Sequence, residues 1–335
     1  MLSIFESLSG VFCCGLMIGL GYYLTERKWF NRETGQLFSK LAMTVTIPLY
    51  IIVSMMRSYT KADLLSLGLA VIVPFVTMVI TYMIGVGVSL IGAIRIPEYR
   101  RGAFRAMFFV SNSAFIGFPV QVALFGSKAL PIAVMYYLVQ TLLFWTIGAY
   151  GLGIDGPKFA RVEGAQGSAG LEVTPHPRIL SLETLKKLIS PPIIGVAVAI
   201  LFILCSIKLP TFIRDTFNYL GSMTTPLAML FLGIAIHLAR LRSVRITRDV
   251  VMLIAARFLI APAVVLIACH LFPVPDLMRK VLVIEAAMPV MTQVGIAARA
   301  YNADANYVAV LTALTTVISL FTIPTYFILL TFRII

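Results

Sequence analysis

Ten consecutive residues, Ser111 to Val120, hold the first group of side chains in this chain that could do chemistry. They place two hydroxyls, an amide, a glycine and a proline inside an apolar run from Met107 to Phe125, which is long enough to cross a bilayer. In hydrocarbon, non-helical backbone survives only where protein or a water-filled cavity covers it, and proline removes a backbone donor. Two interpretations follow: a broken helix that holds a solute near the midplane, or a proline kink whose polar groups bond neighbouring helices.

The composition identifies a membrane protein. Of the 335 residues, 60% are hydrophobic and 12% are charged, whereas about a quarter of the residues in a soluble domain are charged. The basic residues behind the net charge of +13 lie between hydrophobic runs, so they indicate membrane orientation and no nucleic-acid partner. The four cysteines fall in apolar runs without metal-ligand spacing, and we expect no cofactor apart from a coupling proton or sodium ion.

Ten hydrophobic segments, each near the length of a membrane-spanning helix, predict an all-α polytopic membrane protein. They cover residues 3–24, 41–57, 64–94, 106–126, 129–153, 188–207, 216–239, 249–272, 281–299 and 305–332. The connections after odd-numbered segments hold 18 Lys and Arg residues, and those after even-numbered segments hold 7. Basic connections face the cytoplasm, so we expect a multi-pass protein of the inner (plasma) membrane with both termini outside.

A long connection divides the chain into two halves of five segments. Residues 1–153 form the first half, 154–187 a flexible cytoplasmic linker rich in glycine and charge, and 188–335 the second half. Segments two and seven share the motif Thr-x-Pro-Leu, at Thr46–Leu49 and Thr224–Leu227. Segments five and ten share seven residues at a constant offset of 176. We interpret this as a duplication, and because five is odd, the two repeats are inverted in the membrane.

The repeat assigns a partner to the polar stretch of segment four. At the same offset, Asn112 to Pro119 corresponds to Met288 to Gly295 in segment nine, which also mixes proline, glycine and polar residues. Irregular helices at corresponding places in two inverted repeats are typical of a transporter binding site. This favours the broken, solute-binding helix over the kink.

These motifs resemble those of the auxin efflux carrier family, which belongs to the bile-acid symporter-like superfamily. The similarity lies in Asn112-x4-Gly117-x-Pro119, in Ala287-Met288-Pro289 and in the prolines of segments two and seven, and it covers nearly the whole chain. The resemblance implies that segments four and nine cross at their breaks. It also implies a mobile transport domain of segments 3–5 and 8–10 that moves like an elevator against a scaffold of segments 1, 2, 6 and 7, which often forms a homodimer.

One departure from the family pattern concerns segment nine. Where some relatives have a crossing proline, this chain has Val294-Gly295. We therefore expect the break at this place to be milder, or to depend on the flexibility of glycine.

A carboxylate solute needs hydrogen-bond donors aimed at it in a cleft of low dielectric constant. The N-terminal ends of half-helices supply unpaired N–H groups and about half a positive charge each. The predicted substrate-binding residues are Ser111, Asn112, Ser113, Gly117, Pro119, Pro289, Met291, Thr292, Gln293 and Ile47. For the polar members the alternative is hydrogen bonding between helices, and for the apolar ones it is core packing.

Two charged residues lie deep in the predicted segments, where charge is costly and functional by default. Arg257 lies in segment eight and Glu285 in segment nine. One hypothesis, which we place first, pairs them as a structural ion pair. In the other, Glu285 carries a coupling proton and Arg257 is the counter-charge of the substrate.

Together these features predict a secondary active transporter (permease) of a small organic anion, such as a mono- or dicarboxylate, driven by a proton or other ion gradient. The alternatives are an anion efflux uniporter driven by the membrane potential, and a channel or receptor on the same fold. We do not expect an enzyme, because the segments hold no nucleophile–base set, catalytic carboxylate pair or ATP-binding loop. The expected partners are the anion, the lipid bilayer and a second copy of the chain.

Overall fold

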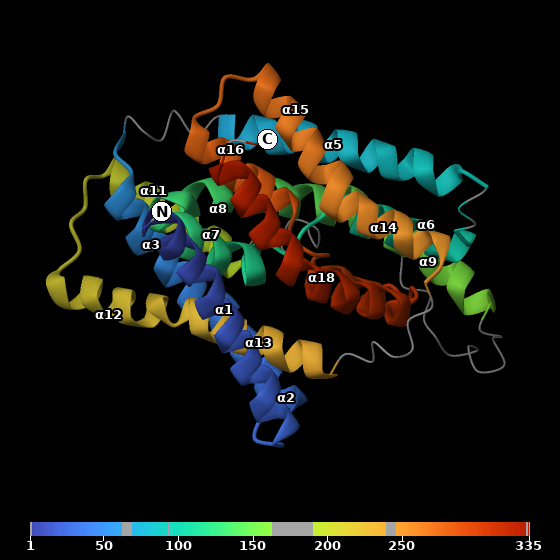
Figure 1. Cartoon of the computed structure of the whole chain (residues 1–335), viewed down its shortest axis with the longest axis horizontal. Coiled ribbons are helices and arrows are strands. Elements are labelled where there is room, and N and C mark those ends of the chain that lie inside the picture. The colour runs from blue at the N-terminus through green and yellow to red at the C-terminus, as the bar shows by residue number, and fades with distance from the viewer. Residues whose placement is uncertain are drawn as a thin grey trace.

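The computed structural model describes residues 2–61, 69–92, 94, 96–162, 190–238, 246–332 and 334, with the side chains of residues 2–11 and 69 left out. Within these residues every named element is a helix, which confirms the all-α prediction (Figure 1). Short 3-10 and π turns, labelled η, interrupt several of the α-helices.

The helices follow the predicted segments in order. Those before the long connection are α1 (Leu2–Glu26), α2 (Arg32–Leu41), η1 (Ala42–Thr46), α3 (Ile47–Ser58), α5 (Leu69–Leu90), η2 (Glu98–Arg100), α6 (Arg101–Phe109), η3 (Ser113–Gly117), α7 (Phe118–Phe125), η4 (Ser127–Ala129), α8 (Leu130–Leu143), η5 (Phe144–Gly148) and α9 (Ala149–Val162). Those after it are α11 (Pro191–Leu204), α12 (Thr211–Ser222), α13 (Thr224–Leu238), α14 (Arg248–Ala255), η7 (Ala256–Ile260), α15 (Ala261–Leu271), α16 (Asp276–Ala286), α17 (Thr292–Ala300) and α18 (Ala305–Thr331).

Within the described residues, six helical stretches are long and apolar enough to cross a membrane, which makes this a multi-pass membrane protein. They are Arg32–Ser58, Ala70–Leu90, Ser127–Val162, Thr211–Leu238, Arg248–Leu271 and Ala305–Thr331. Of the other four predicted segments, the fourth and ninth are each divided into shorter helices, and the sixth contains the shorter helix α11. The first segment, α1, has side chains that are described only in part. Ten crossings therefore stay a prediction.

The long connection begins later than predicted. Residues 154–162 of the expected linker continue α9, although Gly156 and Pro157 interrupt the helical pattern of the sequence. Asp155 explains why the helix continues here, because its buried carboxylate accepts hydrogen bonds from the N–H groups of Gly102 and Ala103, at 3.0 and 2.7 Å. The first N–H groups of a helix have no partner within that helix, so these two donors at the start of α6 need an acceptor from elsewhere. Residues 163–187 of the expected linker lie outside the described part of the chain.

Three π turns have a common cause. η1, η3 and η7 each end two residues before a proline, at Pro48, Pro119 and Pro262. Proline lacks an N–H and its ring clashes with the carbonyl four residues earlier, and a wider turn relieves the clash. In η7 that carbonyl belongs to Phe258, and the Tyr326 hydroxyl of α18 donates to it at 2.7 Å. A neighbouring helix thus satisfies the acceptor that the proline leaves free.

The helices pack in two groups. In the first, α1 lies along α13, α2 packs on α13, and α3 packs against α11 and α12 (Figure 1). Glycines allow α1 and α13 to approach closely: a Cβ on Gly21 would lie 2.5 Å from the Leu230 carbonyl oxygen, and one on Gly233 would clash with that of Ile18. In the second group, α5, α6, α8, α9 and α14–α18 pack on one another, and α7 lies between the groups, against α1 and α13 on one side and α8 on the other.

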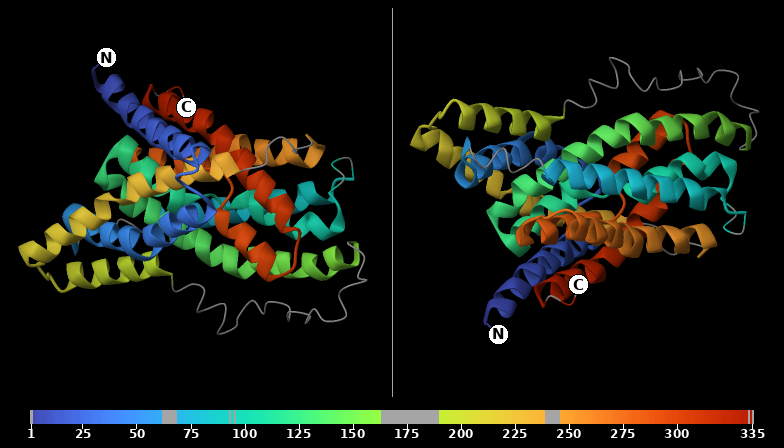
Figure 2. Two further views of the ribbon diagram at one scale, coloured as in Figure 1. Left: turned by 90° about the horizontal axis from the view of Figure 1, so that it is seen from below. Right: turned by 90° about the horizontal axis from the view of Figure 1, so that it is seen from above.

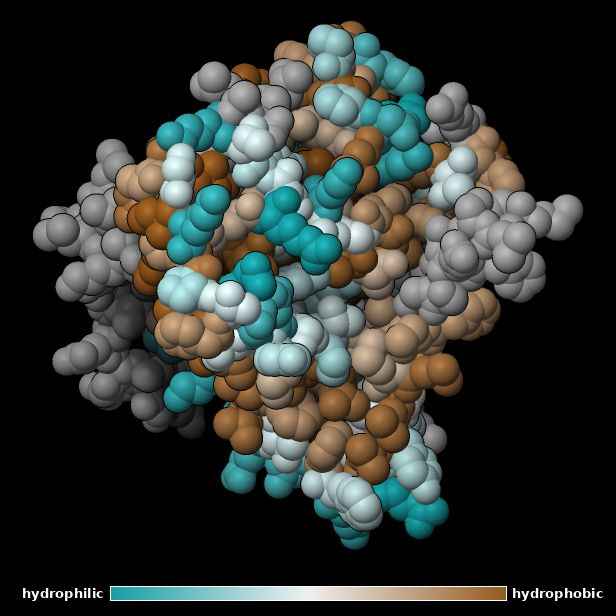
Figure 3. Space-filling model, turned by 90° about the vertical axis from the view of Figure 1, so that its left-hand side faces the viewer, coloured by the Kyte–Doolittle hydropathy of each residue, from teal (hydrophilic) through white to brown (hydrophobic). Residues whose placement is uncertain are grey.

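Polar contacts join several connections at one end of the molecule. Arg100 pairs with Asp304 at 2.7 Å, and the Tyr307 hydroxyl donates to Asp249 at 2.8 Å. Arg100 and Asp304 belong to the third and ninth connections, Asp249 to the start of α14 and Tyr307 to the start of α18. At the other end, seen in Figure 3, hydrophilic side chains gather over the centre and hydrophobic ones lie around them. Both views in Figure 2 show the two chain ends close together.

Candidate functional site

The two broken segments meet at their breaks. Residues 110–112 separate α6 from η3, and residues 287–291 separate α16 from α17. An antiparallel β-bridge joins Ser111 to Val290, and the Asn112 N–H donates to the Pro289 carbonyl at 2.8 Å. The backbone polar groups that each break exposes are thus partly satisfied by the other break, as buried backbone requires.

A buried glutamine of α8 completes this backbone pairing. The Gln140 carbonyl accepts from the N–H and the hydroxyl of Ser111 at 2.7 and 2.8 Å, and its amide donates to the Ser111 carbonyl at 2.7 Å. The same amide contacts the Met291 sulfur at 3.7 Å. From α18, the Thr315 hydroxyl accepts from the Val290 N–H at 3.2 Å. Side chains from two other helices therefore hold both breaks in place.

The break in segment nine does not lie where the family pattern suggested. Val294 and Gly295 are inside α17, whereas the non-helical residues are centred on Pro289. The expectation of a mild break at Gly295 is therefore wrong. Proline disfavours the helical region for the residue before it, and the chain leaves the helix around Met288 for this reason.

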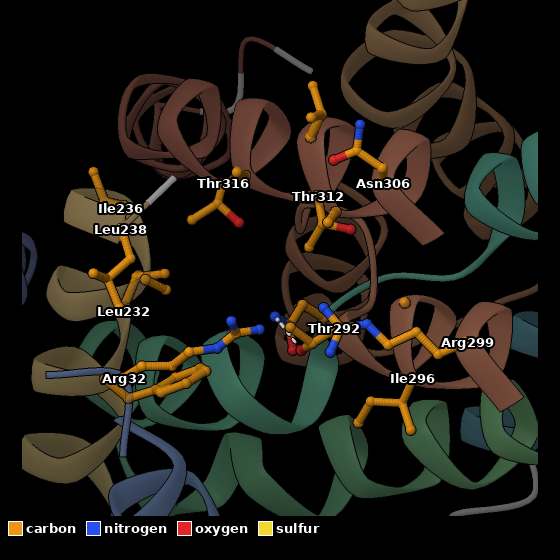
Figure 4. Close-up of a pocket in the computed structure, with 17 residues that line it drawn as sticks. Arg32, Leu232, Ile236, Leu238, Thr292, Ile296, Arg299, Asn306, Thr312 and Thr316 are labelled. Atoms are coloured by element: carbon orange, nitrogen blue, oxygen red, sulfur yellow. Dashed lines mark hydrogen bonds between the residues drawn. The ribbon is translucent and has the colours of Figure 1, made fainter. Parts of the chain in front are cut away.

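A cavity of about 570 Å³ opens beside the crossing of the two breaks (Figure 4). Asn112 and Thr292 lie in its wall, and the Asn112 amide donates to the Thr292 hydroxyl at 3.2 Å. These two residues start the half-helices η3 and α17, so the N-terminal ends of both half-helices border the cavity. The remaining walls come from α13, α18, the rest of α17 and the start of α2, and the volume suits a small organic molecule.

Two arginines point into this cavity from opposite sides. Arg32 reaches in from the start of α2 and Arg299 from the end of α17, both toward Thr292 (Figure 4). Within the described part of the chain neither has an acidic partner within 4 Å, and the lining contains no Asp or Glu. Thr312 of α18 also lines the cavity, and its buried hydroxyl oxygen has no hydrogen-bond partner in the described part of the chain. A cavity lined in this way attracts an anion.

The predicted binding residues divide between several places. Asn112 and Thr292 line the cavity. Ser111, Ser113, Met291 and Gln293, together with Asn112 and Thr292, surround a separate small void of about 10 Å³. Pro289 contributes its carbonyl to the crossing, and Pro119 lies buried at the start of α7. Ile47 is buried at the start of α3 and lines neither space.

Arg257 and Glu285 do not form the predicted ion pair. Both are fully buried, but no Arg257 nitrogen lies within 4 Å of the Glu285 carboxylate among the ion pairs of the described residues. Arg257 instead donates to backbone carbonyls at 2.8–3.3 Å, those of Phe108, Ala286 and Met288. The hypothesis of a structural pair between them is therefore wrong.

The Glu285 carboxylate lies against the backbone of η3. A Cβ on Gly117 would be 2.7 Å from both carboxylate oxygens, so only glycine allows this approach. Within the described residues neither oxygen has a hydrogen-bond partner of good geometry, although the side chains of Ser113 and Gln121 lie beside the carboxylate. The buried carbonyl oxygen of Gln121, whose amide donates to Val281 at 3.0 Å, also lacks a partner there. These are three unpartnered acceptors, and an ionised carboxylate in such a place would cost several kcal/mol.

Comparison with known proteins identifies the family. A model of a family described as membrane transport protein matches residues 3–327. The chain belongs to this family. It is the family of the auxin efflux carriers, as the motifs of segments four and nine indicated.

Two archaeal relatives of this transporter align along nearly their whole length. An uncharacterized transporter of Methanothermobacter thermautotrophicus is 25% identical over 317 residues, which cover 94% of this chain and 95% of the relative. An uncharacterized transporter of Methanocaldococcus jannaschii is 23% identical over 313 residues, which cover 92% and 94% respectively. The chain is thus similar to complete transporters.

Sequence reasoning missed most of the cavity of this transporter. Arg32, Arg299, Asn306, Thr312 and Thr316 line it but were not among the predicted residues. From the sequence, Arg32 and Arg299 contribute only to the charge that orients the protein in the membrane. Nothing in their local spacing distinguishes them from the other basic residues of the connections. Gln140 was a detectable signal, since it is a lone amide in a strongly apolar segment.

Proposed function

We propose that this membrane transport protein is a secondary active transporter of small organic anions such as mono- or dicarboxylates. The observation that carries the proposal is the cavity at the crossing, with Arg32 and Arg299 turned inward and no acidic residue among the described residues that line it. An anion in this cavity would meet two guanidinium groups, the Asn112 amide and the N-terminal end of α17. Charge-assisted hydrogen bonds of this kind contribute about 1.5–3 kcal/mol each.

The arrangement of the cavity walls supports an elevator mechanism. Arg32 and the α13 residues belong to the first packing group, the predicted scaffold, whereas Asn112, Arg299 and the α18 residues belong to the second, the predicted transport domain. A cavity between two groups of helices is exposed or closed when one group slides past the other, and here the sliding surface would include the contacts of α7 with α1 and α13. An anion between Arg32 and Arg299 would also cancel their mutual repulsion during that motion.

Internal contacts support the inverted repeat. The Thr224 hydroxyl donates to the Thr46 hydroxyl at 2.9 Å, and these are corresponding residues of the Thr-x-Pro-Leu motif. In the same way the break of segment four contacts the break of segment nine. Contact between a residue and its own counterpart is expected where a pseudo-two-fold axis passes between two repeats.

The location of the basic residues supports a cavity open to the cytoplasm. Arg32 and Arg299 belong to the first and ninth connections, which are odd-numbered and hold the excess of Lys and Arg. We therefore propose that the structure is an inward-facing state in the inner membrane, with both chain ends on the outer side.

Glu285 is the proposed carrier of a coupling proton. A proton on its carboxylate would let it donate to a neighbouring acceptor without a partner among the described residues, such as the Gln121 carbonyl oxygen, and it needs no additional space. A hard metal cation such as Ca²⁺ or Mg²⁺ takes six or more oxygen ligands, and the carboxylate already lies against Gly117. These features favour a proton over a metal ion at this position.

A binding screen followed by vesicle flux tests the proposal. Purified protein is heated with a panel of small mono- and dicarboxylates, because only a ligand of the folded state raises its thermal stability. The best anion is then measured in proteoliposomes. We expect saturable uptake that a pH gradient drives, and counterflow of labelled anion.

Variants of the two arginines locate the site. Arg32→Ala and Arg299→Ala should each weaken the binding of the anion about tenfold to a hundredfold, through the loss of one charge-assisted hydrogen bond. Arg27→Ala is the matched control, because Arg27 lies in the same connection as Arg32 but outside the cavity. Equal affinity in all three variants would refute the site, flux that follows only the imposed voltage would indicate a uniporter, and binding without flux would indicate a receptor.

A further inference from the structure

Arg257 bonds to both broken helices at once. Its guanidinium donates to the Phe108 carbonyl at 3.3 Å, to the Ala286 carbonyl at 2.8 Å and to the Met288 carbonyl at 2.9 and 3.3 Å. Phe108 is the penultimate residue of α6, Ala286 is the last residue of α16, and Met288 lies in the break. The carbonyls are those that the two breaks leave without helical partners.

The charges at this point balance without a carboxylate. The C-terminal end of a helix carries about half a negative charge, so the ends of α6 and α16 together match one guanidinium. Arg257 is completely buried, and the described part of the chain supplies no acidic partner to it. Its four hydrogen bonds use most of the five N–H donors of the group.

We propose that Arg257 is a built-in cation that holds the two broken helices together at their carbonyl ends, in the place of a bound metal ion. Backbone carbonyls from two half-helices that converge on one point are a typical ligand set for a hard cation. Here the guanidinium occupies these oxygens permanently. This role of Arg257 is separate from the proposed transport function. The two proposals share one consequence, which is that binding of the anion needs no metal ion at these carbonyls.

The position of Arg257 also explains how the crossing is organised. The guanidinium holds the C-terminal ends of α6 and α16, while the N-terminal ends of the following half-helices face the cavity through Asn112 and Thr292. Because Arg257 projects from η7 in segment eight, it ties segments four, eight and nine into one unit. Arg257 acts through the helices and is a positioning residue.

The test compares thermal stability in chloride salts of different cations, without any organic anion. Wild-type protein should have the same melting temperature in sodium, potassium and choline chloride. Arg257→Ala should melt several degrees lower in choline chloride and regain part of the loss in millimolar guanidinium chloride, which fills the vacated place. Arg279→Ala is the control, because Arg279 is a partly exposed arginine on α16 that pairs with Asp276, and its loss should not create any response to guanidinium.

Two further variants separate charge from volume. Arg257→Lys keeps the positive charge, whereas Arg257→Gln keeps donors but loses the charge, so the lysine variant should melt higher. This comparison decides the matter if the alanine variant does not fold. A glutamine variant as stable as the lysine variant, an alanine variant without rescue, or a wild-type melting temperature that rises in sodium over choline would each overturn the proposal.

The measurement does not depend on the proposed transport function. A failure to find any stabilising carboxylate would count against the transport proposal and leave the response to the four salts unaffected. Conversely, a sodium-dependent wild type that still binds a carboxylate such as succinate would overturn only the role of Arg257.

Discussion

Asn112 has both a structural and a binding role, which its position in the sequence could not separate. Its backbone N–H bonds to Pro289, and its side chain lies in the cavity wall beside Thr292. The backbone bond to Pro289, the Ser111–Val290 bridge and the Gln140 contacts all remain when the side chain is removed, and only its bond to Thr292 is lost. The side chain is therefore available to a ligand, and its removal should spare the fold.

We expect Asn112→Ala to weaken the binding of the stabilising anion about tenfold or more, because a hydrogen bond to a charged group contributes roughly 1.5–3 kcal/mol. Calorimetric titration measures the affinity, and the melting temperature without ligand shows that the protein remains folded. Ser113→Ala is a suitable control, since Ser113 lies in the small void and not in the cavity. An unchanged affinity for Asn112→Ala would remove this residue from the site.

Glu285 makes a separate prediction about pH. If its proton is the coupling ion, wild-type uptake should rise as the external pH falls, because the protonated carboxyl is the form that crosses with the anion. Glu285→Gln mimics the protonated form, so its counterflow should persist while the pH dependence disappears. Tyr136 of α8 is a buried neighbour of this carboxylate, and Tyr136→Phe serves as a control that should keep the wild-type profile. A normal pH profile in Glu285→Gln would leave the carboxylate without a role in coupling.

The breaks and the cavity differ in how much of them could be predicted from sequence. Pro289, Asn112 and Gly117 disturb long apolar runs, so their irregularity is visible in the local pattern. Arg32 and Arg299 are far apart in the sequence, and only the packing of α2, α13 and α17 brings them to the same cavity. Long-range packing leaves no signal in the local spacing of residues. For the same reason the sequence could suggest a pair between Arg257 and Glu285 from their opposite charges but could not show that the two are kept apart.

Helix boundaries were predictable where composition changes and not where contacts decide them. α9 continues past Gly156 and Pro157. Its Asp155 carboxylate is held there by hydrogen bonds from the start of α6, the helix that packs against it. The composition of residues 154–162 therefore predicts a linker, whereas contacts with another helix keep these residues helical. The π turns before Pro48, Pro119 and Pro262 show the opposite case. Here the steric effect of proline on the preceding turn, which can be read from the sequence, is also seen in the structure.

The crossing of α1 and α13 depends on glycine, and a matched pair of variants tests it. Gly21→Ala would place a methyl group 2.5 Å from the Leu230 carbonyl oxygen, whereas Gly19→Ala, two residues away on the same helix, has nothing within 4 Å. Overpacking of this kind costs roughly 1–3 kcal/mol. We expect Gly21→Ala to lower the melting temperature by several degrees and Gly19→Ala to leave it unchanged or slightly higher, because alanine favours helix. Equal melting temperatures would show that the two helices separate easily.

The two packing groups make a prediction about transport by the whole molecule. At the end of the molecule away from the cavity, the Ser54 hydroxyl of α3 donates to the Ser127 carbonyl before α8, at 3.0 Å. This contact joins the predicted scaffold to the predicted transport domain. If transport requires one group to slide past the other, a covalent bond here should stop it.

The experiment uses a background without the four native cysteines. Ser54→Cys with Ser127→Cys should lose vesicle uptake on oxidation and regain it on reduction, while anion binding in detergent persists because the cavity stays open. Thr46→Cys with Thr224→Cys is the matched control, since these hydroxyls lie 2.9 Å apart within the predicted scaffold and their disulfide should leave uptake intact. Full uptake by the oxidised Ser54–Ser127 pair, with its disulfide verified by mass spectrometry, would mean that the two groups do not slide at this contact and that access to the site alternates by local gating instead.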